Sequence, residues 1–141
     1  MPNLLLADDK AVTRKALLSI LTNEFPPDVT YTEAEDGMDA VEKAQALQPD
    51  VAVLDLVMPR LNGLKAAEEI ARTCPETKVL VISMYDPAPL YKKLREAGVS
   101  GFVPKSAAAL ELVAAIESLL LGKTFFGLPG SYPLPEVARS C

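Results

Sequence analysis

The chain has 141 residues, half of them apolar, and its 19 acidic residues outnumber 14 basic ones to give a formal net charge of −5. This length supports one core of ordinary domain size rather than two, and the acidic balance disfavours direct binding of nucleic acid, which needs clustered Lys and Arg. Cys74 and Cys141 are too few for a disulfide framework and no apolar run approaches the ~20 residues of a membrane span, so we expect a soluble, cytoplasmic protein that does not enter the membrane.

Short apolar runs alternate with longer helical patterns along the chain, which is typical of β-α-β units around a parallel sheet. The predicted strands cover residues 3–7, 29–34, 51–55, 78–83 and 101–103. The predicted helices cover residues 11–23, 37–47, 63–73, 88–97 and 107–121. Five strands and five helices in strict alternation indicate a doubly wound α/β fold with helices on both faces of the sheet.

Local signals mark where the helices begin and where the domain ends. Asp36, Asn62 and Ser106 each stand just before a predicted helix, where a side-chain oxygen can cap the first turn. From Lys123 the sequence is rich in proline and glycine without a sustained period. We therefore expect one domain over residues 1–122 and a tail or linker over residues 123–141.

Acidic residues stand at the ends of two predicted strands. Asp8 and Asp9 follow the first strand, and Asp55 ends the third. Each alone would be an ordinary cap or turn former, but the carboxyl ends of neighbouring parallel strands open onto one crevice. Three crowded carboxylates there call for a cation such as Mg²⁺, which prefers oxygen ligands, and the backbone carbonyl of Val57 is placed to add another.

Two further polar residues stand at strand ends that face the same crevice. Ser83 closes the fourth strand and Lys105 follows the fifth. Taken singly, each is an ordinary exposed polar residue. Together, a hydroxyl, an ammonium and a divalent cation would satisfy the three anionic oxygens of a phosphoryl group attached to Asp55.

These segments resemble the receiver domains of two-component response regulators over about residues 3–122. The resemblance is carried by ADD at residues 7–9, DLVMPRLNG at 55–63, SMYD from Ser83 and GFVPK ending at Lys105. It is closest to the branch that carries a LuxR-type helix-turn-helix output domain. It implies a flavodoxin-like (βα)5 fold with strand order 2-1-3-4-5, and phosphorylation of Asp55 with Mg²⁺ or Mn²⁺ by a histidine kinase, a phosphotransfer protein or a small phosphodonor.

The resemblance also implies roles for the other residues at the strand ends. Asp9 would bind the metal directly and Asp8 largely through water. Ser83 would hydrogen-bond the phosphoryl group and Lys105 would form an ion pair with it. The peptide bond before Pro104 is often cis in such domains, which the sequence does not decide.

A switch is implied at Ser83, Tyr85 and Phe102. Phe102 matches the position of an aromatic residue whose rotamer follows the movement of the hydroxyl residue, although a core aromatic explains it equally well. Tyr85 would lie over the mouth of the site. Lys10 departs from the neutral or aromatic residue common in this branch and adds positive charge beside the acid cluster.

A partner surface is implied on the first and last helices, which can form a dimer face in this family. Leu110, Ala114 and Leu121 make a second apolar stripe on the last helix, separate from its core face. Leu17 and Leu18 contribute from the first helix. Single exposed leucines are also normal on protein surfaces.

The leading interpretation is a signalling switch that takes part in its own phosphorylation but turns over no external substrate. It would be a single-domain regulator if the chain is complete, or the receiver of a transcription regulator if it is cut from a longer protein. A haloacid dehalogenase-type phosphatase is an alternative, but that class needs a second Asp where Val57 stands. A non-phosphorylated receiver-like interaction module is the third interpretation, although no acid or lysine position is lost.

Overall fold

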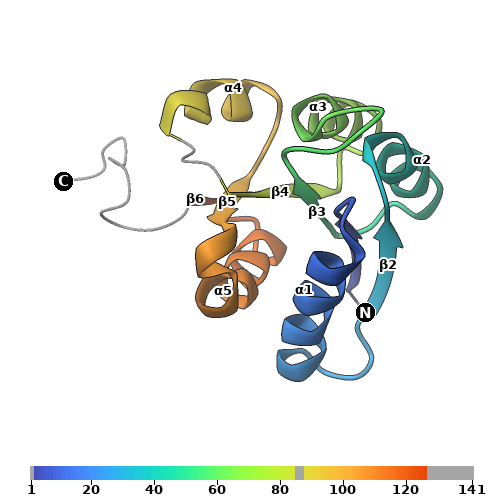
Figure 1. Ribbon diagram of the computed structural model, residues 1–141, viewed down its shortest axis with the longest axis vertical. Coiled ribbons are helices and arrows are strands. Elements are labelled where there is room, and N and C mark those ends of the chain that lie inside the picture. The colour runs from blue at the N-terminus through green and yellow to red at the C-terminus, as the bar shows by residue number, and fades with distance from the viewer. Residues whose placement is uncertain (1, 85–87, 127–141) are drawn as a thin grey trace.

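A parallel sheet lies between two layers of helices in the computed structural model, which describes residues 2–84 and 88–126 (Figure 1). Its six strands within these residues are β1 Asn3–Ala7, β2 Thr30–Ala34, β3 Val51–Asp55, β4 Lys78–Ser83, β5 Gly101–Pro104 and β6 Phe125–Phe126. Their order in the sheet is β2-β1-β3-β4-β5-β6, and every neighbouring pair is parallel. The predicted order of the first five strands is therefore confirmed.

The helices cover both faces of this sheet. They are α1 Ala11–Glu24, α2 Gly37–Leu47, α3 Gly63–Thr73, α4 Tyr91–Glu96 and α5 Ala108–Leu120, with 3₁₀ turns at Ala88–Leu90 and Lys105–Ala107. Figure 1 shows α1 and α5 on one face and α2, α3 and α4 on the other. Right-handed crossovers produce this division, because they place each connecting helix on a fixed side of its two strands.

The central strands are apolar throughout because both of their faces are buried. Leu4 and Leu6 of β1 belong to the core cluster on the α1 and α5 side, whereas Leu5 belongs to the cluster beneath α2, α3 and α4. Side chains alternate between the faces of a strand, so a strand covered on both sides needs a continuous apolar run. The continuous apolar runs of β1, β3 and β4 are therefore explained by burial on both faces.

Two of the three predicted helix caps are present. The side chains of Asp36 and Asn62 each accept a hydrogen bond from the backbone N–H three residues on, at 2.8 and 3.0 Å. The prediction for Ser106 was wrong. It lies inside the 3₁₀ turn that precedes α5, and Ala107 takes the cap position without a side-chain bond.

Helix α4 is shorter than the predicted residues 88–97. The segment begins as a 3₁₀ turn and becomes α-helical only at Tyr91. Pro89 accounts for this difference, because proline lacks the backbone N–H and disfavours the α conformation of the residue before it. The peptide bond before Pro104 is trans.

The prediction of five strands was wrong, because the sheet continues into the predicted tail. Strand β6 pairs with β5, which would otherwise present an unpaired edge. Phe126 fixes this strand from the helix side. Its ring meets Tyr91 edge to face, with centroids 5.1 Å apart, and the guanidinium carbon of Arg95 lies 5.0 Å from its centroid. Residues 127–141 lie outside the described part of the chain, so the division into domain and tail stays a prediction.

The predicted partner residues fall into two groups. Leu110 and Leu121 are 86% and 73% exposed, Ala114 is also exposed, and Leu18 is partly buried. Leu17 is only 5% exposed because it packs in the core beneath α1. This corrects the expectation for Leu17, whose side chain is not available to a partner.

Among the described residues, no helix combines the length and apolar character that crossing a membrane requires.

Candidate functional site

The three aspartates predicted from the strand ends do lie together. Strands β1 and β3 are neighbours, with Ala7 opposite Leu54, so the residues that follow come out at the same edge of the sheet. One carboxylate oxygen from each of Asp8, Asp9 and Asp55 lies within 4.8 Å of the others. Asp8 and Asp55 are only 1% and 4% exposed. Two of the three negative charges therefore have little contact with solvent.

Lys105 joins two of these carboxylates. Its Nζ lies 3.1 Å from Oδ2 of Asp8 and 3.1 Å from Oδ2 of Asp55. Burial by itself would lower the pKa of Lys105, but pairing with both carboxylates outweighs burial and raises that pKa above its ordinary value. Lys105 is therefore an ammonium ion at neutral pH.

Asp55 remains short of positive charge despite this ion pair. The backbone N–H of Val57 donates to its Oδ1 at 3.2 Å. Burial nevertheless raises the pKa of Asp55 above its usual range, and the hydrogen bonds from Val57 and Lys105 only partly oppose this. An isolated buried carboxylate is unfavourable unless further positive charge compensates it.

The oxygen atoms of the cluster fit a hard divalent cation. Oδ2 of Asp8 is buried and, beyond its ion pair with Lys105, accepts no hydrogen bond of good geometry from the described residues. Carboxylate oxygens in this number suit Mg²⁺ or Mn²⁺ and are unlike the nitrogen and sulfur ligands that Zn²⁺ takes. Val57 is adjacent through its backbone N–H, and the role of its carbonyl as a ligand stays a prediction.

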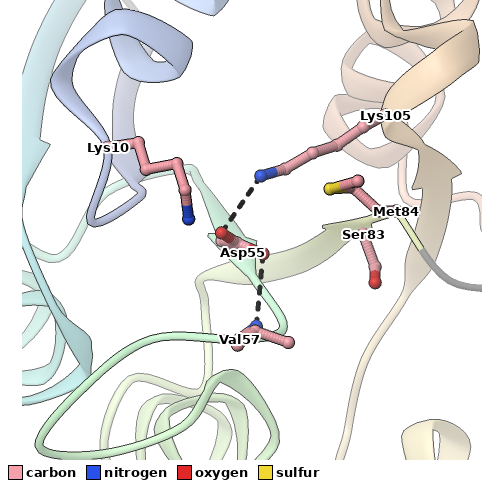
Figure 2. A pocket seen from close by; sticks show the side chains of 6 residues that line it. All are labelled: Lys10, Asp55, Val57, Ser83, Met84 and Lys105. Carbon is pink, nitrogen blue, oxygen red and sulfur yellow. Dashed lines mark hydrogen bonds and ion pairs between the residues drawn. The ribbon is translucent and has the colours of Figure 1, made fainter.

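A small cavity opens above Asp55 (Figure 2). Its volume is about 90 Å³, and its lining residues are Lys10, Asp55, Val57, Ser83, Met84 and Lys105. Pockets for organic ligands usually measure ~300 Å³ or more. The cavity is therefore suited to a small ion or a single phosphoryl group and leaves no room for a flavin or a nucleotide.

The predicted switch residues differ in their surroundings. Ser83 ends β4, is 1% exposed and lines the cavity beside Asp55. Phe102 is completely buried in the core beneath α2, α3 and α4, as an ordinary core aromatic would be. Tyr85 lies outside the described residues. The switch roles of all three stay predictions.

Gly63 is needed where α3 approaches the strand that carries Asp55. A Cβ atom at this position would overlap the carbonyl oxygen of Asp55. The N–H of Gly63 also donates to the carbonyl of Leu56 at 2.9 Å. The loop after Asp55 therefore closes tightly onto its own strand because residue 63 has no side chain.

Sequence reasoning missed the role of Arg14 in holding the acid cluster. Its guanidinium donates to the carbonyl oxygen of Asp8 at 2.7 Å and to Oε1 of Glu33 at 2.8 Å, and its side chain is 11% exposed. Lys15 contacts the other oxygen of Glu33 at 2.8 Å. Both cations lower the pKa of Glu33. Arg14 lies in the first turn of α1, a few residues after the acidic segment, and this closeness in the sequence is the signal that could have indicated its role.

We expect Arg14→Met to lower the free energy of unfolding by about 1 to 3 kcal/mol, because the partly buried carbonyl of Asp8 loses its charged donor and Glu33 keeps only Lys15 of its two cations. Urea unfolding measures this change. Lys15→Met is the matched control, since it loses only an exposed ion pair with the same Glu33 and should cost less than about 1 kcal/mol. Equal losses in the two variants would show that the contact with Asp8 contributes nothing.

Comparison with known proteins gives a consistent set of relatives. A family model described as the response regulator receiver domain matches residues 4–117. Response regulator UvrY of Escherichia coli K12 is 34% identical over 125 residues, which are 89% of this chain and 57% of that protein. Oxygen regulatory protein NreC of Staphylococcus carnosus is 34% identical over 123 residues, 86% of this chain and 56% of that protein.

Solved structures agree with this result. A LuxR-family two-component response regulator from Aurantimonas superposes with a TM-score of 0.80 at 30% identity, covering 89% of each chain. A LuxR-family DNA-binding response regulator from Silicibacter pomeroyi gives 0.78 at 28% identity, covering 94% of this chain and 100% of that one. The present chain spans little more than half the length of UvrY and NreC.

Proposed function

The chain belongs to the response regulator receiver domain family, in its LuxR-type branch, and we propose that Asp55 is the phosphoacceptor of a phosphorylation-dependent switch. Members of the family are signalling proteins that interact with histidine kinases and do not turn over external substrates. The observation that carries the proposal is the position of Asp55, buried at the cavity with two other carboxylates and an ammonium around it.

The proposed chemistry is transfer of one phosphoryl group. A carboxylate oxygen of Asp55 attacks the phosphorus, and the bond from phosphorus to the leaving group breaks. The leaving group keeps the electron pair, and Asp55 becomes an acyl phosphate. Lys105, already 3.1 Å from Asp55, supports this by offering positive charge to the phosphoryl oxygens, and Ser83 offers a hydroxyl from the neighbouring strand.

A divalent cation completes this proposal. Asp8, Asp9, Asp55 and the backbone carbonyl of Val57 would hold Mg²⁺ or Mn²⁺, with Asp9 direct and Asp8 largely through water. When bound, the ion supplies the positive charge that a transferring phosphoryl group requires. Without it, Asp8 and Asp9 would repel the phosphodonor, because both are acidic and lie beside the acceptor.

The output of the switch is proposed from the same residues. The ion pair between Lys105 and the phosphoryl group would favour one of two conformations, with Ser83, Tyr85 and Phe102 moving between them. The donor would be a histidine kinase or a phosphotransfer protein. The exposed residues Leu110, Ala114 and Leu121, with Leu18, would form a homodimer surface. Any contact with DNA would then belong to a separate output domain.

Acetyl phosphate tests the proposed chemistry without the natural kinase. The protein is incubated with acetyl phosphate and Mg²⁺, and its intact mass is recorded. We expect one adduct of about 80 Da, the mass of a phosphoryl group. Repeated turnover of p-nitrophenyl phosphate without an adduct would instead support the phosphatase alternative, and neither adduct nor turnover would contradict both.

A further inference from the structure

Lys10 stands at the beginning of helix α1, but its side chain does not stabilise the helix there. It is the N-cap residue of α1, yet its side chain makes no capping hydrogen bond. N-caps are usually Ser, Thr, Asp or Asn, because an oxygen there accepts a backbone N–H and an ammonium does not. Its backbone N–H donates to Oδ1 of Asp8 at 2.9 Å, an interaction that most residues could make. The lysine side chain therefore needs an explanation other than helix stability.

That side chain extends over the phosphoacceptor cavity. Lys10 lines the cavity together with Asp55, and Figure 2 shows the side chains of Lys10 and Lys105 reaching toward Asp55 from different sides. The two lysines differ in burial. The Lys105 side chain is 17% exposed, whereas that of Lys10 is 68% exposed and has its Nζ 3.7 Å from Oδ1 of Asp9. Lys105 is held within the site, and Lys10 stands at its solvent side.

The charges of the site show what a second ammonium changes. Three carboxylates face two lysines, which leaves one uncompensated negative charge. A divalent cation adds two positive charges, and phosphorylation replaces the single charge of Asp55 with about two. The metal-bound, phosphorylated site is then close to neutral. Without Lys10 it would retain one negative charge, and an incoming phosphate dianion would meet a less favourable potential.

We propose that Lys10 is a specificity-determining residue that favours doubly charged phosphodonors and weakens divalent-cation binding. This rests on the proposed function of Asp55. An acyl phosphate such as acetyl phosphate is a dianion at neutral pH, and its phosphorus passes to an Asp55 oxygen while acetate leaves with the electron pair. Phosphoramidate carries one net negative charge less, so its approach depends less on Lys10. The same ammonium repels a divalent cation at the carboxylates.

The flexible stem of lysine suits this position. An exposed ammonium on a flexible four-carbon chain changes its contacts at little cost. Its present contact with Asp9 is a surface ion pair of the kind that contributes ~1 kcal/mol or less. Lys10 is therefore free to exchange that contact for the phosphoryl group. If it were only a solvated surface lysine, its removal would change neither the choice of donor nor the affinity for cations.

The test compares Lys10→Met with wild type, both as the 141-residue chain. Phosphorylation rate constants are measured with acetyl phosphate and with phosphoramidate, and the Mg²⁺ dissociation constant is measured by calorimetry without any phosphodonor. At low salt we expect the acetyl phosphate rate to fall about tenfold and the Mg²⁺ affinity to rise about tenfold, as one charge acting on a doubly charged ion ~6 Å away in a largely aqueous medium would produce. The phosphoramidate rate should change less. The differences should shrink at high salt.

Two control variants separate this effect from net charge. Lys123→Met removes the same charge from an exposed residue between α5 and β6. This residue lies at the amino-terminal ends of the strands, away from the carboxyl ends that carry the site, and its substitution should leave all three constants unchanged. Lys10→Arg should retain the wild-type preference for acetyl phosphate.

Lys10→Met with wild-type Mg²⁺ affinity and an unchanged ratio of donor rates would overturn the proposal, as would equal changes in Lys123→Met. If no variant, wild type included, accepts phosphate from either donor, the proposed function fails. The Mg²⁺ titration still decides on Lys10 in that case, because cation binding requires no phosphoryl transfer.

Discussion

Asp55→Asn is expected to abolish phosphorylation by acetyl phosphate, to less than about 1% of the wild-type rate, because an amide cannot act as the attacking carboxylate. The substitution is nearly isosteric. The oxygen of the new amide would still accept the Val57 N–H, and Lys105 would retain its ion pair with Asp8. Intact mass should therefore show no adduct of about 80 Da in a protein that remains folded.

Asp50→Asn is the matched control for this experiment. Asp50 immediately precedes β3, at the opposite end of the strand from Asp55, and its Oδ2 accepts the backbone N–H of Asn3 at 2.8 Å. The control should incorporate phosphate at the wild-type rate. A persisting adduct in Asp55→Asn would refute Asp55 as the sole acceptor, provided that circular dichroism shows both variants folded.

Removal of the divalent cation, or of the carboxylates that would bind it, should have the second large effect. We expect chelation to abolish phosphoryl transfer and Mg²⁺ or Mn²⁺ to restore it, because the buried carboxylates of Asp8 and Asp55 otherwise repel the donor. Asp9→Ala should also abolish transfer by removing a direct ligand. Asp8→Ala should weaken Mg²⁺ binding by about 10 to 100 fold, the usual effect of losing a group that supports a metal through an intervening ligand.

Calorimetric Mg²⁺ titration and acetyl phosphate incorporation are measured on the same variants, so that binding and transfer are compared directly. Glu76→Gln provides the control. Glu76 is exposed between α3 and β4, at the edge of the sheet away from the cluster, and its substitution removes one negative charge without touching the site. Undiminished transfer in chelator, or equal loss of Mg²⁺ affinity in Glu76→Gln, would contradict a metal site at Asp8, Asp9 and Asp55.

Much of the fold and the centre of the site follow from patterns that are local in the sequence. A strand buried on both faces requires a continuous apolar run, and such runs mark β1, β3 and β4 without reference to their neighbours. Parallel strands have their carboxyl ends at one edge. Asp8 and Asp55 therefore had to meet once the fold class was known, and the structure brings them together with Asp9 and Lys105.

Other features depend on neighbours that are distant in the sequence. Strand β6 has only two residues, too few to give a periodic signal in the sequence. It forms because it pairs with the edge strand β5 and because Phe126 packs against Tyr91 and Arg95. Leu17 and Leu18 are adjacent in the middle of α1, and the sequence pattern did not decide which of them faced the sheet. Burial is set by how a helix is rotated against its partners, which a local pattern constrains only within a residue or two.

The contacts of the long cationic side chains at the site also could not be predicted from the sequence. The sequence placed Lys10 beside the acids, but only the tertiary structure shows that it lines the cavity over Asp55 and that Arg14 reaches across to the carbonyl of Asp8. A short carboxylate stays close to its backbone, so strand topology alone fixes its position. A lysine or arginine spans several ångströms along a flexible stem, and its contacts are decided by whichever groups the folded chain places within that reach.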